Sequence, residues 1–248
     1  MGFVRRELKG RFAGTTVGVL WALLNPLALM LAYLMVFSVI MRMQVRAEEV
    51  GTDSFWIFFL TGLFPWLIFS EALNRATGVL VDNANLITKV VFPVELLPAS
   101  SVISSLIING IGMSAFLVYL AFAGYLGITW VLILVLMICQ ILFTLGLAMF
   151  LSALCVFIRD VRELLGIVIM FWFFSTPILY PLSFVPESLA RFIKLNPMTW
   201  FIHGYRDVLL THEFNAYTLL PIVLFAVFTY ALGAWFFMRS RSGFGDVL

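Results

Sequence analysis

The longest uncharged stretch of the chain runs from Leu96 to Ile158, 63 consecutive residues without Asp, Glu, Lys or Arg. A helix needs about 20 apolar residues to cross the hydrocarbon core of a bilayer, so this stretch is too long for one crossing and suits two. Residues 124–129 supply the expected break between them. Strands of a membrane barrel would alternate polar and apolar residues, and these residues do not. The stretch therefore predicts an all-α integral membrane protein.

The composition agrees with a chain that uses the bilayer as its solvent. Hydrophobic residues make up 63% of the 248 residues and charged residues 11%, whereas soluble domains are about half apolar and about a quarter charged. Polar groups are too few to cover a water-exposed surface. The formal net charge of +2 is too small to indicate a nucleic-acid partner.

Apolar segments predict six transmembrane helices in one domain over residues 1–248. The predicted spans are about 15–41, 55–81, 97–122, 130–158, 164–180 and 216–238. Lys and Arg residues then divide ten to five between the connections on the two sides. Because the side richer in Lys and Arg usually faces the cytoplasm, both termini are predicted to be cytoplasmic. The predicted location is the cytoplasmic (inner) membrane.

The N-terminal residues 1–14 carry a basic and an apolar helical face. Val4, Leu8 and Phe12 share the apolar face, and the basic residues lie mostly elsewhere. This pattern predicts an amphipathic helix in the cytoplasmic interface. The alternative is a basic tail that only sets the topology.

Residues 181–213 are too long for a turn and too apolar for a free loop. They predict two short helices separated by Asn196-Pro197, with apolar faces made by Leu189, Phe192 and Ile193 in the first, and Phe201, Tyr205, Val208 and Leu209 in the second. Neither helix is long enough to span. We expect them to dip into the outer leaflet or rest on it.

Residues 82–96 form a cytoplasmic connection with a helical pattern of its own. An apolar face is shared by Leu86, Ile87, Val90 and Val91. Pro93 should end this helix, because the residue before a proline avoids the helical region. Glu95 then precedes the third span, where a helix N-terminus favours negative charge, and Pro98 suits a first turn. The alternative is a simple interfacial connector.

A search for catalytic or metal-binding motifs finds none. The chain has no G-x-x-x-x-G-K-[ST] phosphate loop, no H-E-x-x-H and no cysteine pair at zinc spacing. His203 and His212 could in principle form a metal or acid–base pair, but interfacial polar roles are favoured. Glu71 and Arg75 can pair at i,i+4, as a structural pair or in gating. The chain is predicted to be no enzyme and to bind no cofactor or metal itself.

Aromatic residues are 16% of the chain. They favour either an interfacial and lipid-facing belt or a lining on which the apolar faces of a ligand such as a sugar could stack. Composition leaves both readings open. The candidate lining residues in the first and fifth spans are Trp21, Tyr33, Phe37, Phe171, Trp172, Phe174 and Tyr180.

Four stretches in this order resemble one family: GVLWALLNPL, NANLITKVVFPVELLP, FIRDVRELLGIVIMFWFFSTPILYP and LNPMTWFIHGYRDVLL. They are similar to the membrane subunit of ABC-2 type polysaccharide exporters, which move O-antigen, teichoic acid and capsular chains. The resemblance covers nearly the whole chain.

The resemblance implies a homodimeric permease in membrane lipid, docked on two separate ATP-binding cassette subunits that hold ATP and Mg. It implies a lipid-linked polysaccharide as substrate, moving through a channel at the dimer interface. The implied ATPase-coupling residues are Leu86, Ile87, Lys89, Val90, Phe92, Pro93, Glu95, Arg159 and Asp160. The implied external gate residues, between spans five and six, are Pro186, Asn196, Pro197, Tyr205 and Arg206.

Two other functions compete with this one. The first is an ABC-2 permease for a small drug or a lipid. The second, from another class, is a membrane scaffold or enzyme that transports nothing.

Overall fold

The computed structural model describes residues 21–89 and 92–248. Within these ranges, helices are the only regular secondary structure, which confirms the all-α class. The predicted N-terminal interface helix and Val90 lie outside the described residues, as do the side chains of Trp21 and its nearest neighbours.

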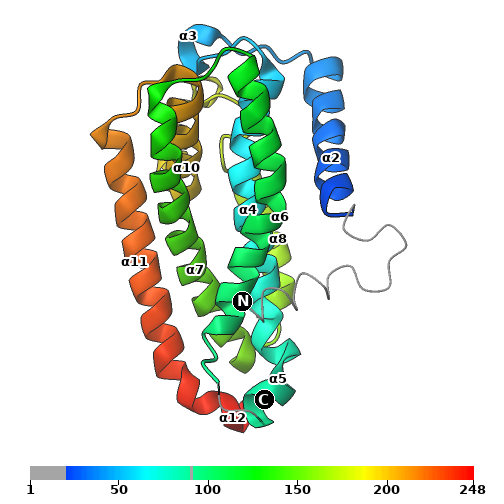
Figure 1. The fold of residues 1–248 in the computed structure, drawn as a ribbon, viewed down its shortest axis with the longest axis vertical. Helices are drawn as coiled ribbons and strands as arrows, with labels where there is room; N and C mark the ends of the chain where they lie inside the picture. Colours follow the sequence, from blue (N-terminus) through cyan, green and yellow to red (C-terminus); the bar gives the residue numbers. More distant parts are fainter. Residues whose placement is uncertain (1–20, 90–91) are drawn as a thin grey trace.

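The elements follow one another as a series of long helices with short helical connections (Figure 1). They are α2 (Trp21–Leu34), the π-helical η2 (Met35–Ile40), α3 (Ala47–Val50), α4 (Phe55–Asp82), α5 (Ala84–Lys89), α6 (Leu96–Phe122), η3 (Ile128–Leu132), α7 (Ile133–Phe157), α8 (Val161–Phe174), η4 (Leu182–Phe184), α9 (Glu187–Leu195), α10 (Pro197–Arg206), η5 (Asp207–Thr211), α11 (Ala216–Ser240), η6 (Arg241–Gly243) and α12 (Phe244–Val247).

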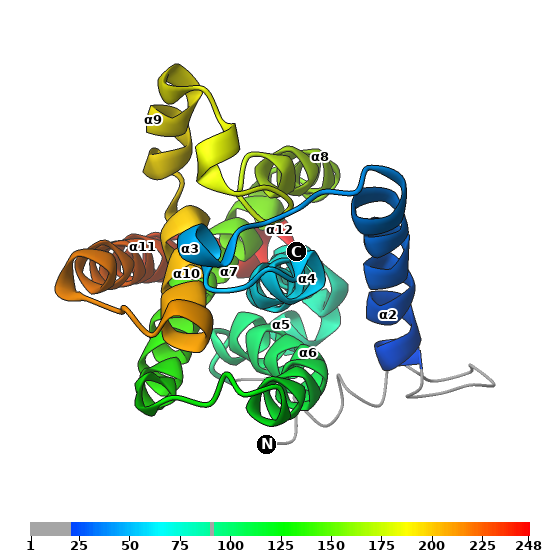
Figure 2. The same cartoon turned by 90° about the horizontal axis from the view of Figure 1, so that it is seen from above.

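The long helices run along the longest axis of the molecule, with α3 and α10 at one end and α5 and α12 at the other (Figure 1). We call these the outer and inner ends, following the orientation predicted from the Lys and Arg residues. Helix α4 occupies the centre of the bundle (Figure 2) and contacts α2, α5, α6, α7, α8 and α10. It is apolar on all sides over most of its length, which is the pattern of a helix enclosed by others.

Four helical segments are long and apolar enough to cross a membrane. They are Ala47–Asp82, Leu96–Phe122, Ile128–Phe157 and Tyr217–Gly243, and they correspond to the second, third, fourth and sixth predicted spans. In the first predicted span the described apolar helix is shorter, Leu27–Ile40. Helix α8 has 14 residues, or about 21 Å at 1.5 Å per residue, against a core of about 30 Å. The six-span topology therefore stays a prediction.

The break predicted at residues 124–129 is confirmed. Helix α6 ends at Phe122, and the 3-10 helix η3 begins at Ile128. Gly124 has a φ of +90°, which a residue with a side chain rarely adopts. The glycine thus lets the chain reverse between the third and fourth spans.

A second, smaller core closes the inner end of the bundle. It contains Val79, Leu80, Val94, Leu97, Met149, Ala153, Val156, Phe237 and Phe244. Phe244, four residues from the end of the chain, is fully buried, with its ring 5.4 Å from that of Phe237 and 6.2 Å from that of Phe157. The C-terminal segment is therefore packed into the fold beside α5.

Candidate functional site

The predicted coupling segment forms a short helix at the inner end (Figure 1). Helix α5 turns Ile87 toward the second core, and Phe92 packs there as well. Thr88, Lys89 and Pro93 are exposed. The segment therefore packs Ile87 and Phe92 against its own bundle and leaves Thr88, Lys89 and Pro93 exposed. Its role in coupling stays a prediction.

The other predicted coupling residues lie near α5 at the same end. Glu95 immediately precedes α6, as predicted, and its Oε2 lies 3.6 Å from Arg241 Nη1 near the end of α11. Arg159 and Asp160 are exposed in the turn between α7 and α8. Next to them, Arg162 Nη1 lies 3.0 Å from Asp82 Oδ1 at the end of α4. The two ion pairs thus connect the ends of four helices around the coupling segment.

Aromatic rings from α2 and α8 meet beside α4. The ring of Tyr33 lies 5.4 Å from that of Phe173 and 6.2 Å from that of Phe37, and Trp172 meets Phe69 edge to face at 5.1 Å. The candidate lining residues Tyr33, Phe37, Trp172 and Tyr180 are half-buried, whereas Phe171 and Phe174 are exposed. The Tyr180 hydroxyl donates to the Phe174 carbonyl at 2.8 Å.

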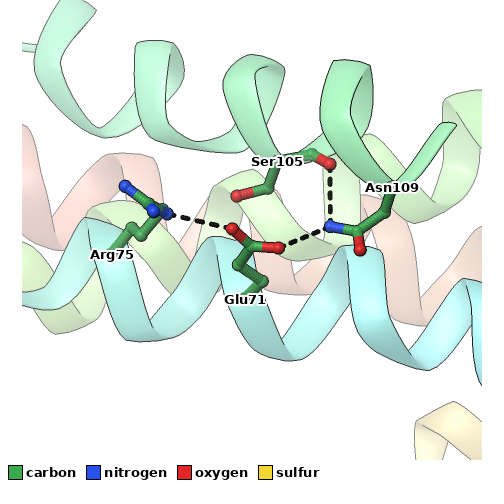
Figure 3. A network of polar contacts seen from close by, with 4 residues as sticks. All are labelled: Glu71, Arg75, Ser105 and Asn109. Carbon is green, nitrogen blue, oxygen red and sulfur yellow. Dashed lines mark hydrogen bonds and ion pairs between the residues drawn. The ribbon is translucent and has the colours of Figure 1, made fainter. Parts of the chain in front are cut away.

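A polar network joins α4 to α6 inside the bundle (Figure 3). The predicted pair is confirmed: Arg75 Nε lies 3.0 Å from Glu71 Oε1. Asn109 Nδ2 donates to Glu71 Oε2 at 2.6 Å and to the Ser105 carbonyl at 3.1 Å. A carboxylate held from two helices fits the structural role for this pair. Sequence reasoning missed Asn109, although a row of small polar residues, Ser100, Ser101, Ser104, Ser105 and Asn109, marks this face of α6.

The two predicted short helices before α11 are α9 and α10, and Asn196 separates them as expected. Its side chain accepts hydrogen bonds from Met198 N at 3.0 Å and from Trp172 Nε1 at 2.7 Å, and it donates to Thr176 Oγ1 at 2.8 Å. Pro197 is the first residue of α10, where a missing N–H costs nothing. Asn196 thus caps one helix and fastens it to the end of α8.

The apolar faces of the two helices have different surroundings. The apolar face predicted for the second short helix, Phe201 and Tyr205 on α10 with Val208 and Leu209 on η5, is fully buried in the core and does not rest on the leaflet. Leu189 and Phe192 on α9 are exposed, and so is Pro186 just before that helix. Helix α10 is therefore part of the core, while α9 projects from the bundle (Figure 2).

Tyr205 and Arg206 reach into the centre of the subunit. The Tyr205 hydroxyl donates to Gln140 Oε1 at 2.9 Å, and Gln140 Nε2 donates to the Pro65 carbonyl at 2.7 Å. Arg206 is 4% exposed and lies over the Phe58 ring, 3.6 Å from its centroid. It donates to three main-chain carbonyls, those of Pro177 at 2.7 Å, Ile178 at 3.2 Å and Phe58 at 3.3 Å. These bonds tie α10 to α4 and to the turn after α8.

The two histidines lie in separate surroundings. His212 Nδ1 is 2.9 Å from Thr129 Oγ1, while His203 sits on α10 beside Arg206. Among the described residues, no group of three or more His, Cys, Asp and Glu side chains could hold a metal ion.

The surroundings of His203 predict that the folded protein loses stability in acid. Burial, followed by the charges of Arg206 and Lys194, lowers the pKa of His203 from 6.5 to about 4. Between pH 6.5 and 4 the His203 imidazole is protonated in the unfolded chain but stays neutral in the folded chain. The free energy of unfolding should therefore fall as the pH drops from 6.5 to 4. The loss is about 3 kcal/mol at 1.36 kcal/mol per pKa unit. Unfolding of the purified protein across this range measures it.

A His203→Gln variant is the control for this prediction. The raised pKa of Asp207, caused by burial, acts in the opposite direction and is present in both proteins. The variant should lose less stability than the parent between pH 6.5 and 4. Equal losses would contradict the assignment to His203.

One family model and several relatives match this chain. The model described as "ABC-2 type transporter" matches residues 2–210. The chain is similar to the O-antigen export system permease protein RfbA of Myxococcus xanthus, with 35% identity over 217 residues, 86% of this chain and 80% of the relative. It is 29% identical to an RfbA protein of Klebsiella pneumoniae over 98% of this chain and 92% of the relative. It is 27% identical to the polysialic acid transport protein KpsM of Escherichia coli over 83% of this chain and 78% of the relative.

Proposed function

The chain belongs to the ABC-2 type transporter family, and on this premise we propose that it is the permease subunit of an exporter for lipid-linked polysaccharide in the cytoplasmic membrane. The observation that carries the proposal is the similarity, over 83% to 98% of the chain, to proteins named for O-antigen export and polysialic acid transport. Both substrates are sugar polymers. The chain is a transporter subunit and not an enzyme, and ATP is hydrolysed by a separate subunit.

We further propose that the working unit is a homodimer bound to two ATPase subunits. Movement of the ATPases would enter at α5, whose exposed side chains face away from the bundle. Helix α4 then supplies a continuous connection to the outer end, because Asp82 lies next to α5 and Phe58 is held by Arg206 of α10. Its central, enclosed position suits a helix that moves as a rigid body.

Aromatic side chains are proposed to form the track for the polymer. Stacking on aromatic faces is weak at each ring and tolerant of sequence, so a long chain could slide where one tight site would stall it. The exposed Phe171 and Phe174 on α8 are available to a second subunit or to the polymer. Phe173 links Phe174 to Tyr33, and Trp66 links Phe173 to Trp172, in the same aromatic group.

Trp172 offers a test that separates stacking from hydrogen bonding. Trp172→Ala should slow polymer export about tenfold or less, because it removes both the ring and the bond to Asn196. Trp172→Phe loses only the bond and should export near the normal rate. Surface polymer appearance after induction measures both. Equal slowing in the two variants would assign Trp172 to positioning Asn196 and not to the track.

Lys89 tests the coupling surface. Its side chain is exposed at the end of α5, so Lys89→Glu should leave the fold intact and reduce retention of the ATPase severalfold through reversed charge. Co-purification of the two subunits measures this retention. Lys194→Glu on α9, also exposed but at the outer end, is the matched control and should retain the ATPase fully. Unchanged retention in Lys89→Glu would remove this residue from the interface.

Deletion of the gene tests the function itself. Lipid-linked polysaccharide should accumulate on the cytoplasmic side of the membrane, and surface polymer should disappear. Normal surface polymer would contradict the proposal and favour a permease for a small drug or lipid. Failure of the protein to co-purify with any ATPase would favour a scaffold or an enzyme.

A further inference from the structure

A cavity of about 420 Å³ opens at the outer end between α3, η4 and α10, the elements grouped at that end in Figures 1 and 2. Its volume lies within the range of about 300–1,000 Å³ that is usual for small-molecule sites. The polar groups on its wall come from Glu49, Ser183, His203, Arg206, Asp207 and Thr211. They originate from three separate parts of the sequence, so the cavity exists only in the folded chain.

Arg206 is the buried cation of this cavity. Its Nη groups are committed to main-chain carbonyls, but its Nε is buried without a hydrogen-bond partner among the described residues. Burial lowers the pKa of Arg206 to about 9, so the side chain stays charged at neutral pH. With all three guanidinium nitrogens enclosed or bonded, Arg206 contributes its positive charge to the cavity wall.

The remaining wall groups are mainly acceptors and hydroxyls. Glu49 Oε2 accepts from Ser183 Oγ at 2.7 Å, and Asp207 Oδ2 accepts from Thr218 Oγ1 at 3.1 Å. His203 is neutral at pH 7 because burial lowers its pKa. Two carboxylates against one cation disfavour an anionic ligand, and the cation disfavours a positively charged one. A neutral ligand with several hydroxyl groups fits, because its hydroxyls can donate to the two carboxylates and exchange hydrogen bonds with the Ser183 and Thr211 hydroxyls.

A second cavity of about 880 Å³ adjoins the first and shares Glu49, Pro181 and Ser183 with it. It extends along the connection between α2 and α4 and adds Arg42, Gln44, Arg46 and Asp53. The two cavities share three lining residues and together provide a larger polar surface at the outer end than either alone. A chain of repeating units could occupy it.

We propose that the smaller cavity is a sugar-binding subsite for neutral hexose units of the polymer as it leaves the membrane. The inference rests on the proposed function. Binding there would be weak, through hydroxyl contacts with Glu49, Asp207 and Thr211, and would be repeated as each unit passes. Such a site would hold the polymer at the outer end between strokes of the ATPase.

Site-directed labelling tests this subsite in the intact exporter. Cys139 and Cys155 are buried, so an introduced cysteine becomes the accessible thiol of the described chain. Ser183→Cys, and Thr211→Cys on η5, are labelled with a membrane-impermeant maleimide in spheroplasts. Cells that synthesise the lipid-linked polymer are compared with cells blocked in its synthesis. Ser188→Cys on α9, exposed and outside both cavities, is the matched control.

Polymer should slow labelling of Ser183→Cys and Thr211→Cys about threefold, as for a site about two-thirds occupied, and leave Ser188→Cys unchanged. Equal labelling with and without polymer, while surface polymer appears normally, would overturn the subsite and leave the proposed function standing. Slower labelling at Ser188→Cys as well would also overturn it, because the shielding would then be general. Absence of polymer export by this protein would remove the proposed function and the subsite together. If the Ser183→Cys protein fails to accumulate in the membrane, the labelling rates of Thr211→Cys with and without polymer decide between these outcomes.

Discussion

Gly233→Ala is expected to separate α11 from α7 and to destabilise the subunit by about 3 kcal/mol, at the upper end of the range for overpacking. A methyl group on Gly233 would overlap the main chain of Gly146. In the reverse direction, a methyl group on Gly146 would lie 2.6 Å from the Tyr230 Cα. The obstructing atoms are main chain, so no side-chain rotation relieves the overlap. Helices in membranes depend on such close approach for their packing.

Thermal unfolding in detergent, together with the amount of protein in the membrane, measures this effect. Gly110→Ala on α6 is the control, because its added methyl group meets no atom within 4 Å beyond its chain neighbours and the backbone of its own helix. Alanine is favoured over glycine inside a helix by about 1 kcal/mol, so this variant should be as stable as the parent or more so. If Gly233→Ala matched Gly110→Ala, the close crossing of α7 and α11 would be refuted.

The features that could be predicted from the sequence are those that depend on residues close along the chain. The four long helices were predictable because the length and apolarity of a span are local properties. The Glu71–Arg75 pair was predictable because residues four apart share a helix face. The break around Gly124 and the helix boundary at Asn196-Pro197 follow from glycine and proline geometry in the same way.

Helix α8 is shorter than the hydropathy of its sequence predicted. The apolar run through Tyr180 favoured a span over 164–180, but the structure ends the helix at Phe174. Pro177 lacks an N–H and disfavours a helical residue before it, and Thr176 Oγ1 donates to the Trp172 carbonyl at 2.7 Å. The chain then turns to present the Pro177 and Ile178 carbonyls to Arg206. Hydropathy alone does not predict this turn.

Contacts between helices could not be predicted in this chain. A helix that is apolar on all sides gives no periodic signal of which face meets which neighbour. The Gln140–Tyr205 and Glu71–Asn109 bonds therefore appeared only in the structure. The same holds for the outer cavity, whose walls come from α3, η4 and α10. Arg206 was predicted as a gate residue from the family resemblance, and its burial among main-chain carbonyls required the fold.

Arg206→Met is expected to loosen the outer end of the subunit by about 3 kcal/mol. The variant leaves the carbonyls of Pro177, Ile178 and Phe58 without their donor, at about 1–3 kcal/mol for each buried acceptor. Relief from burying a cation offsets part of that cost. Arg206→Lys should not restore stability, because one ammonium group cannot reproduce the planar fork that reaches several carbonyls.

Trypsin cleavage at Arg191 and Lys194 measures this loosening directly, because both residues are exposed on α9, which is joined to α10 through Asn196. Cleavage there should be faster in Arg206→Met and Arg206→Lys, since local opening becomes less costly. Arg46→Met is the matched control: it removes an exposed arginine at the same outer end and should change stability by less than about 0.5 kcal/mol. Cleavage rates that are equal in Arg206→Met and Arg46→Met would show that the three carbonyl bonds do not hold α10 in place. Faster cleavage only in the Arg206 variants would instead identify the guanidinium as the contact that fixes α10 to α4.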